Sequence, residues 1–245
     1  MKISNVILTV LASVVALAMV VEISLARSAS QSIDVELTGQ RAERTYEALP
    51  FKHLDVEGPI RVILTAGLPS HRIEADAALL DLLIDKDDDP DRLHLELEQG
   101  DYGDEIVAYI SSPNIESIEL NGSGSVESPE PLPFRQTVLR FSGNPRANLN
   151  FTDAGTLSVD GSGGTNITLA GRTDSLIASF AGGNDLQALN LQANFVSYSA
   201  SGGNSASVNA ERVLDVRGAG STNIEYTGSP RVSQSISGSG SVKAL

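Results

Sequence analysis

From residue 139 to residue 245 the sequence repeats one pattern six times, which restricts this part of the chain to a repetitive fold. Each unit opens with an apolar residue, and successive openings are 18, 19, 20, 18 and 18 residues apart. These openings are Leu139, Leu157, Leu176, Val196, Leu214 and Val232. A second apolar series has the same spacings and consists of Leu149, Ile167, Leu186, Ala206, Ile224 and Val242. A period near 20 residues that is rich in β-forming residues and glycine is typical of a β-solenoid.

Within a unit, apolar and polar residues alternate. Leu157 and Val159 alternate with Ser158 and Asp160, and a glycine-rich turn follows. A period of two residues indicates a strand with one buried face and one solvated face. Equivalent strands of successive units run in the same direction, and such crossovers are right-handed. We therefore predict an all-β fold, a right-handed parallel β-solenoid built from coils of about 19 residues with Gly-rich turns.

The turns between strands carry glycine and asparagine at coil spacing. A tight turn such as the one at Gly202 requires positive φ, which Gly adopts without penalty and Asn adopts at modest cost. The recurring asparagines are Asn166, Asn184, Asn204 and Asn223. Their side-chain amides are expected to form a hydrogen-bonded ladder from coil to coil. The alternative is a polar stripe that contacts a ligand.

The first 26 residues have the features of an export signal. Lys2 precedes an apolar run from Val6 to Val21, and the small-x-small triplet Ser24-Leu25-Ala26 suits signal peptidase. The alternative is an uncleaved inner-membrane anchor formed by residues 3–21, although the apolar run is shorter than the roughly 20 residues of a bilayer span. In both cases the rest of the chain is expected outside the cytoplasm, in the periplasm, at the cell surface or secreted.

Downstream of this signal peptide or membrane anchor (residues 1–26), the sequence divides into two parts. Residues 27–50 are polar without a sustained period, which predicts a spacer. Residues 51–245 are predicted to form a single β-solenoid domain, because strand-like alternation begins just after residue 51 and continues into the repeats. The apolar run from Leu79 to Ile84 fits either a helical turn or a strand.

Charge is distributed unevenly along the chain. The net charge of −14 lies entirely in residues 1–127, and residues 128–245 are neutral. An acidic half and a neutral half argue against a nucleic-acid partner, because phosphates require a basic face. The chain has no cysteine, which excludes disulfides, thiol catalysis and a cysteine zinc site.

Three stretches of the sequence resemble a known family. The first begins at Phe51 and includes Gly58-Pro59-Ile60, and the second is Ser117-Ile118-Glu119-Leu120-Asn121-Gly122-Ser123-Gly124. The third runs from Ile224 through Gly228-Ser229-Pro230 to Lys243. Together they resemble the head GIN domain of putative auto-transporter adhesins, which are exported bacterial proteins. The resemblance implies a β-solenoid-like fold and a role in adhesion or envelope organisation, and the family has no established catalytic residues to carry over.

The densest cluster of carboxylates lies between Asp85 and Asp91. The acids of this segment and Glu96 fall at positions 1, 3, 5, 7 and 12 of a calcium-loop pattern. Pro90 stands where such a loop needs glycine, and Glu96 fits the outward position of a strand. A solvated acidic turn is therefore the preferred interpretation, weak calcium binding is the alternative, and we predict no metal site and no cofactor.

No catalytic residues can be assigned. A polysaccharide lyase or hydrolase needs two or three carboxylates, or a base, in one groove. Among the acids of residues 128–245, Asp160 and Asp215 share a register but lie three coils apart, about 14 Å at strand spacing. His94 is expected to face solvent, and Ser123 lies in a turn, so no nucleophile and base can be paired. We predict that the chain is not an enzyme.

The predicted function is a non-catalytic binding or adhesion-like module of the cell envelope or surface, whose binding residues are not identified. Hydroxyl side chains that are expected to point outward suit contact with a glycan or an envelope protein, and they are those of Ser197, Ser199, Ser201 and Thr168. Alternatives are a membrane-anchored envelope scaffold or stress component, and a carbohydrate-active β-helix enzyme. The last coil, residues 232–245, has no predicted lid and few charges, so it is expected to pair with a second copy or a partner strand, and this association should weaken when Ile236 and Val242 are both changed to Lys.

Overall fold

The structure is a computed structural model that describes residues 35–46, 50–86, 89–98, 100 and 102–245. The predicted signal or anchor segment, residues 1–26, lies outside the described residues. In the described part of the chain, no helix is long and apolar enough to cross a membrane.

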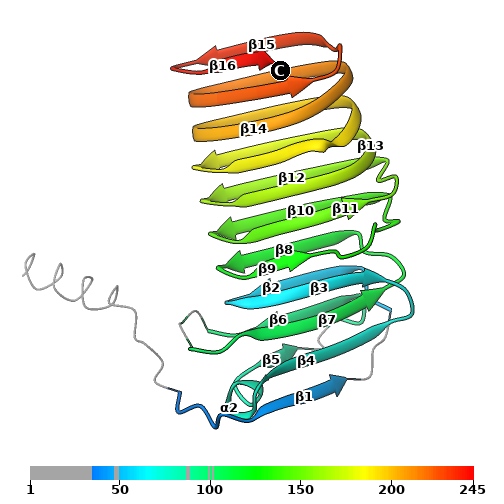
Figure 1. Ribbon diagram of the computed structural model, residues 1–245, viewed down its shortest axis with the longest axis vertical. Helices are drawn as coiled ribbons and strands as arrows, with labels where there is room; N and C mark the ends of the chain where they lie inside the picture. The colour runs from blue at the N-terminus through cyan, green and yellow to red at the C-terminus, as the bar shows by residue number, and fades with distance from the viewer. Residues whose placement is uncertain (1–34, 47–49, 87–88, 99, 101) are drawn as a thin grey trace, which may run out of the picture. The chain divides into compact units, whose positions relative to one another are not determined.

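The fold is a parallel β-solenoid in which each coil contributes one strand to each of two ladders (Figure 1). The first ladder, here called ladder A, contains in spatial order β6 (Arg92–Glu96), β2 (His53–Glu57), β8 (Ser117–Gly122), β10 (Gln136–Gly143) and β12 (Thr156–Gly163). It continues through β13 (Asn166–Gly182) and β14 (Asp185–Thr227) and ends at β15 (Arg231–Ser237).

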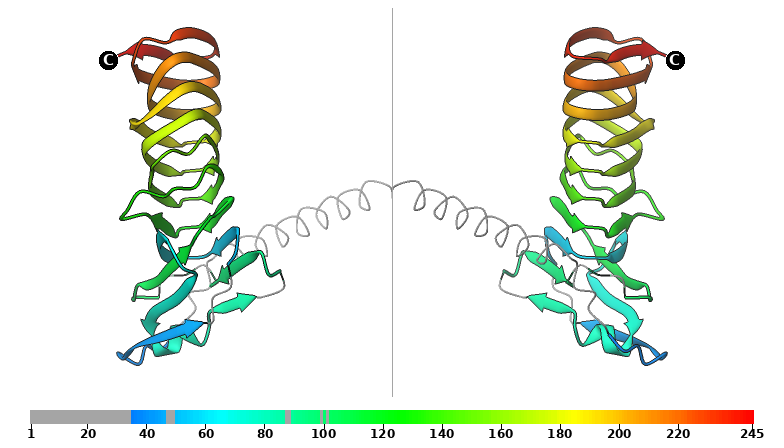
Figure 2. Two further views of the ribbon diagram at one scale, coloured as in Figure 1. Left: turned by 90° about the vertical axis from the view of Figure 1, so that its right-hand side faces the viewer. Right: turned by 90° about the vertical axis from the view of Figure 1, so that its left-hand side faces the viewer.

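The second ladder, ladder B, contains β7 (Ile106–Ser112), β3 (Ile60–Ala66), β9 (Ser125–Glu127) and β11 (Arg146–Phe151). It then follows β13 and β14 and ends at β16 (Ser241–Ala244). The strands β13 and β14 are long because they pass around the turns without a break and therefore join both ladders. Figure 2 shows these turns stacked one above another along the solenoid.

The core lies between the two ladders and is built from the apolar repeats. Leu139, Leu157 and Leu214 are fully buried, and Leu176 and Val196 are almost so. The residues between them point outward, as the alternation predicts. The matching register of successive coils, such as Leu157 opposite Leu176, places like side chains above one another. A core with few aromatic residues can therefore pack closely, because each aliphatic side chain meets an equivalent neighbour.

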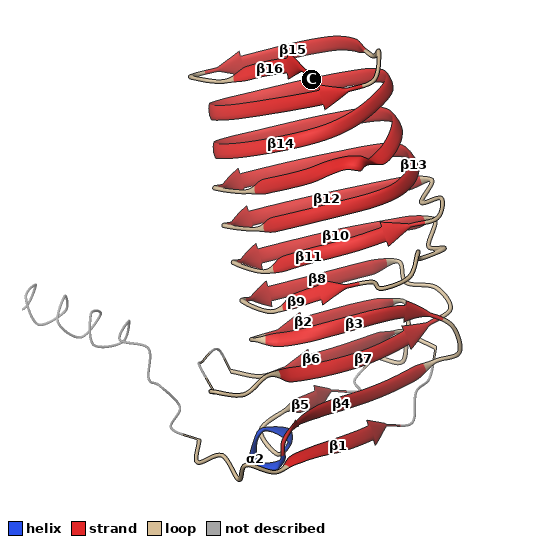
Figure 3. Cartoon of the chain, viewed as in Figure 1, coloured by secondary structure: helices blue, strands red, loops and turns tan. Residues whose placement is uncertain are grey.

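The coils near the N-terminal end are not stacked in sequence order. Strand β2 lies between β6 and β8, so the first coil of the sequence is enclosed by two later coils. Beyond β7 the end of ladder B is covered by antiparallel strands, first β4 (Ser70–Asp76) and then β1 (Arg41–Tyr46). Strand β5 (Ile84–Lys86) pairs antiparallel with β6, and α2 (Ala77–Leu80), the one helix in the described residues, packs beside β1 and β4 (Figure 3).

This N-terminal cap corrects one sequence prediction and resolves another. Strand β1 lies within residues 27–50, which were expected to form a spacer, and the compact unit extends from Val35 to Leu245. The alternation of β1 is hard to recognise in the sequence, because the inward positions of this strand are only half-buried and include Arg44. The ambiguous run from Leu79 to Ile84 is divided, since the end of α2 falls at Leu80 and β5 begins at Ile84.

A hydrogen-bonded ladder does follow the turns, but it uses only part of the predicted set. The side-chain oxygen of Asn184 accepts hydrogen bonds from the backbone and hydroxyl of Thr165, at 3.1 and 2.7 Å. The oxygen of Asn204 accepts from the backbone and side-chain nitrogens of Asn184, at 3.1 and 2.9 Å. Asn166 and Asn223 lie one position further along and are exposed, so they are not part of the Asn184–Asn204 ladder. Asn223 makes a separate contact between coils, because its side-chain oxygen accepts a hydrogen bond from the hydroxyl of Ser241 at 3.2 Å.

Candidate functional site

The outer face of ladder A, here called face A, carries a row of charged side chains across adjacent strands. Arg140 on β10 lies opposite Glu119 on β8 and Asp160 on β12 in the parallel register. Each follows a buried apolar residue, so the alternation of the strand directs all three outward. Parallel strands are spaced about 4.8 Å apart, which brings the cation between the two carboxylates.

Three adjoining hollows open on this face and on the edge beside it. A hollow of about 550 Å³ and another of about 500 Å³ both touch Glu119 and Arg140, one on each side of the charged row. A third, of about 540 Å³, shares Glu116, Gln136 and Thr156 with the first. The three together form one groove that crosses β8, β10 and β12, and we call it the β10 groove.

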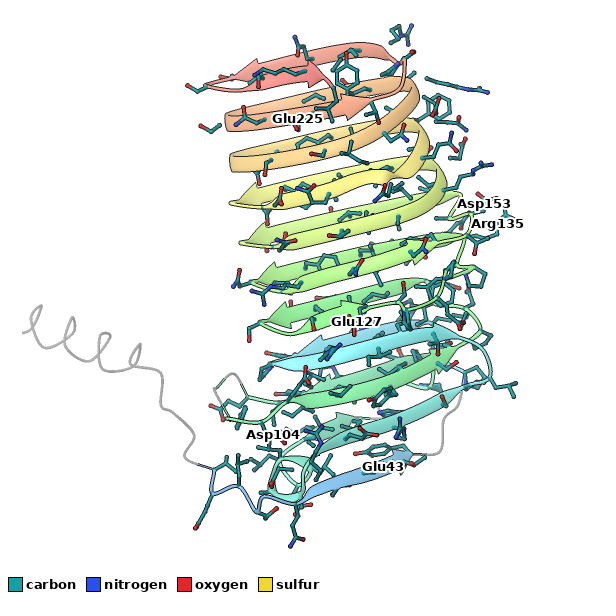
Figure 4. The ribbon with its side chains drawn as sticks, in the orientation of Figure 1. Glu43, Asp104, Glu127, Arg135, Asp153 and Glu225 are labelled. Atoms are coloured by element: carbon teal, nitrogen blue, oxygen red, sulfur yellow. The ribbon has the colours of Figure 1, made fainter. Side chains whose placement is uncertain are left out.

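The edge end of the β10 groove is formed where the chain leaves ladder B for the next coil. Arg135, Gly155 and Asp174 line the groove there. Figure 4 places the side chains of Arg135 and Asp153 at this edge of the stack. Under the edge, Leu132, Phe134 and Ala154 are fully buried, so the connecting segments are held against the core.

Some charged groups of the β10 groove have partners, since Glu119 accepts a hydrogen bond from Asn121 and Asp174 accepts one from Asn194, but others in the described chain have none. Within the described residues, Arg135, Arg140 and Asp160 make no ion pair or side-chain hydrogen bond. The arginines of the N-terminal cap behave differently, because they are paired: Arg41 with Asp104 at 3.1 Å, Arg44 with Asp81 at 2.8 Å, and Arg72 with Glu43 at 3.0 Å. In the adjoining part of ladder B, Arg61 is paired with Glu127 at 2.5 Å. The β10 groove therefore offers free donors and acceptors to a polar ligand.

One wall of the groove is held by internal contacts. The ring nitrogen Nδ1 of His53 lies 2.8 Å from the hydroxyl oxygen of Ser117 on the neighbouring strand. Arg92 donates to Asp55 across the next strand pair. These contacts join β6, β2 and β8, so this side of the groove is ordered before any ligand arrives.

The outward residues predicted as a contact surface are divided between the two faces. Ser197, Ser199 and Ser201 alternate with buried Val196, Tyr198 and Ala200 on face A, and Ser201 also lines the second hollow. Thr168 lies on ladder B and is half-buried. It is therefore on the other side of the solenoid from the three serines.

The acidic segment begins in β5, which contains Asp85, and its residues 89–91 directly precede β6. Asp89 accepts a hydrogen bond from the backbone nitrogen of Asp91, and Asp91 lies 3.7 Å from the amine of Lys52. No group of three metal-binding side chains occurs among the residues that the structure describes. Residues 87 and 88, in the middle of the calcium-loop pattern, lie outside the described residues.

The carboxylates weighed for catalysis do not meet. Asp160 lies on β12, whereas Asp215 lies on the segment of β14 that pairs with β15 and is bound to Arg217 at 2.7 Å. The carboxylate nearest to Asp160 in this row is instead Glu119, on the far side of Arg140. Glu119 lies before residue 128 and so was not among the acids considered for a catalytic pair. The signal for this charged row was present in the sequence, because its three members directly follow the buried residues Ile118, Leu139 and Val159 at coil spacing.

Comparisons with known proteins agree with this architecture. None of the curated proteins matches the sequence. A putative adhesin from Bacteroides fragilis superimposes with a TM-score of 0.74 and 21% identity, over 85% of this chain and 98% of that one. A putative adhesin from Parabacteroides distasonis superimposes with a TM-score of 0.70 and 19% identity, over 86% of this chain and 99% of that one. A putative lipid binding protein from the same species superimposes with a TM-score of 0.67 and 20% identity, over 85% of this chain and 98% of that one.

At these identities the solved structures show a shared fold, and the family rests on the sequence itself. The family model described as "Putative auto-transporter adhesin, head GIN domain" matches residues 50–230 of the 245. This range contains the coils that build the β10 groove. The predicted resemblance is confirmed, and the chain belongs to the head GIN domain family.

Proposed function

We propose that the chain is an exported, non-catalytic binding module that holds a glycan in the β10 groove. The observation that carries the proposal is the set of uncommitted polar groups, because Arg135, Arg140 and Asp160 are accessible and unpaired within the described chain. An arginine can form paired hydrogen bonds to a carboxylate or to vicinal oxygens of a ligand. The adhesin description of the family and of two structural neighbours supports a surface-binding role.

The neutral groups of the groove favour a sugar. Ser117, Gln136, Thr156 and Ser158 supply hydroxyl and amide groups along the same hollow. Such groups both donate and accept, which matches the hydroxyl groups of a glycan. One neighbour is described as a lipid binding protein. An acyl chain would require an enclosed apolar cavity. The first and third hollows are mainly polar, and the second, which also touches Phe141 and Phe180, is open to solvent on face A.

Binding without hydrolysis is supported by the position of Arg140. Glu119 and Asp160 are two strand spacings apart, which is about 9.6 Å. Paired carboxylates of glycosidases stand on either side of the scissile bond. Here the arginine side chain lies between them, where the bond would have to be.

The location outside the cytoplasm is part of the same proposal. The sequence features of residues 1–26 that predict an export signal, and the adhesin description of the family, both support it. Sequencing the N-terminus of the exported protein distinguishes release from anchoring. A mature start near Arg27 indicates cleavage and release, and an intact Met1 indicates an anchored envelope component.

A glycan array probed with the full chain tests the ligand class. We expect selective binding to a small group of glycans, with no release of reducing ends during incubation. Folded protein that binds none of the glycans would contradict the glycan proposal. Cleavage of any bound glycan would contradict the non-catalytic part.

A further inference from the structure

The C-terminal end of the solenoid presents unpaired strand edges. In the described residues, β15 and β16 pair only with β14, so one edge of each strand has no partner. Val232 and Gln234 lie directly over the buried Leu214 and Val216 in the register, yet both are exposed. Val232 retains 36% of its accessible surface and Leu245 retains 66%. The last layer of the core is therefore uncovered.

The exposed strand β15 is self-complementary. Its central residues are Val232-Ser233-Gln234-Ser235-Ile236, which read almost the same in both directions. In an antiparallel pair of two such strands centred on Gln234, each Val232 lies opposite the Ile236 of the second copy. Ser233 then lies opposite Ser235, and Gln234 lies opposite itself. Arg231 lies opposite Ser237, so no like charges face each other along the strand.

We propose that two copies of the chain join end to end through β15, related by a two-fold axis at Gln234. The pairing would satisfy the free backbone groups of both edges and extend ladder A from one copy into the other. Val232 and Ile236 would complete the open core layer. The two Gln234 amides can bond to each other, as the amides of Asn184 and Asn204 do within the stack.

The opposite end of the solenoid does not fit β15. Two strands form the outer edges there. Beyond ladder B it is β1, whose Arg41, Glu43 and Arg44 are held in ion pairs, and beyond ladder A it is β5, which is three residues long and so too short to template a full strand. Charged side chains on an edge strand prevent further strand addition. Pairing through β15 alone uses the same surface on both copies, so it closes at a dimer and does not form a filament.

Single cysteines test the contact and its register. The chain has no cysteine of its own, so each introduced thiol reports on one position. Residues opposite each other in an antiparallel pair have Cα atoms roughly 4.5 to 5.5 Å apart, within the range of a disulfide. The full chain carrying Gln234→Cys, Val232→Cys or Ile236→Cys is oxidised with oxygen and copper phenanthroline and analysed without reducing agent. Ser197→Cys, on face A and away from the edge, is the matched control.

The proposal expects a specific pattern of covalent dimers. Gln234→Cys alone should dimerise, and Val232→Cys mixed with Ile236→Cys should cross-link well, whereas either of these alone should give at most about a tenth as much dimer. Equal cross-linking in all variants and the control would overturn the proposal, as would no cross-linking of Gln234→Cys.

Sedimentation of the cysteine-free chain over a range of concentrations is an independent test of the dimer. We expect a monomer–dimer equilibrium whose dissociation constant rises at least tenfold when Ile236 and Val242 are both changed to Lys. A strictly monomeric chain, or an open series of oligomers, would overturn the proposal. Glycan binding by a monomer would remain possible, so the two proposals fail separately.

Discussion

At the scale of single residues, the glycine column along one turn is the strongest local constraint. Gly182, Gly202 and Gly220 all have positive φ, and Gly202 has a φ of 100°. A Cβ atom added to Gly202 would collide with the carbonyl oxygen of Gly182 in the coil beneath. Both the backbone conformation and the spacing of coils therefore depend on the missing side chain.

Gly202→Val should destabilise the domain by more than about 2 kcal/mol, because strain at positive φ and the backbone collision add together. For a chain of this size that corresponds to a fall in Tm of at least roughly 4 °C. Gly203→Val is the matched control, since a Cβ atom there meets nothing within 4 Å. Equal Tm values for the two variants would refute the tight-turn explanation.

Tyr198 is a buried tyrosine whose hydroxyl has no hydrogen-bond partner in the described structure. Burial, with a smaller contribution from Asp185, raises the pKa of this phenol. Tyr198→Phe should therefore stabilise the domain by about 1 kcal/mol, because the unpaired group no longer has to be desolvated. Tyr226→Phe, at a half-buried position, should change the Tm little. A lower Tm for Tyr198→Phe would show that the hydroxyl is bonded in solution.

At the scale of elements, Asp76 ties the N-terminal cap together. Its carboxylate accepts hydrogen bonds from the backbone nitrogens of Ala78, Thr38 and Gly39, at 2.9, 3.1 and 2.8 Å. Burial alone would raise the pKa of Asp76, but the hydrogen bonds from Ala78, Thr38 and Gly39 outweigh it, so the pKa is lowered. One ionised side chain therefore anchors both the start of α2 and the segment before β1.

The lowered pKa predicts the sign of a pH effect. The stabilisation by Asp76 is fully present above its unfolded pKa of about 3.9 and is lost as the pH falls through the folded value. Asp76→Asn should lower the urea midpoint at pH 7, and its difference from the unaltered chain should shrink toward pH 2. Asp153→Asn, at an exposed carboxylate, should have no such effect. A difference that grows in acid would contradict this role.

The elements differ in how well the sequence predicts them. The coils after residue 139 were predicted because two apolar series, such as those of Leu157 and Ile167, keep the same spacing. The position of β2 between β6 and β8 was not predicted, because a periodic pattern shows where a coil lies in the sequence but not which coil it stacks against. Strand β1 was missed because it packs at the margin of the cap, where burial is incomplete.

At the scale of the whole domain, the family and fold were predictable, but the β10 groove was not. Outward positions such as Arg140 follow from the alternation. The hollows depend in addition on how the connecting segment around Arg135 lies beside the strands, and that is set by the packing of Leu132 and Phe134 in the core. An end-to-end dimer would place two such grooves on one particle and increase avidity for a repetitive glycan.

The affinity of arginine variants for the glycan selected on the array tests the central claim most directly. Removing a charged hydrogen-bond donor costs about 1.5–3 kcal/mol, which is roughly a 10- to 150-fold rise in Kd. Arg140→Ala and Arg135→Ala should each show such a rise. Arg146 is the matched control, because it is exposed, lies on ladder B and has no ion pair among the described residues. Arg146→Ala should change Kd less than about twofold. Equal affinities for all three variants, or a loss confined to Arg146→Ala, would contradict the assignment of the β10 groove as the binding site.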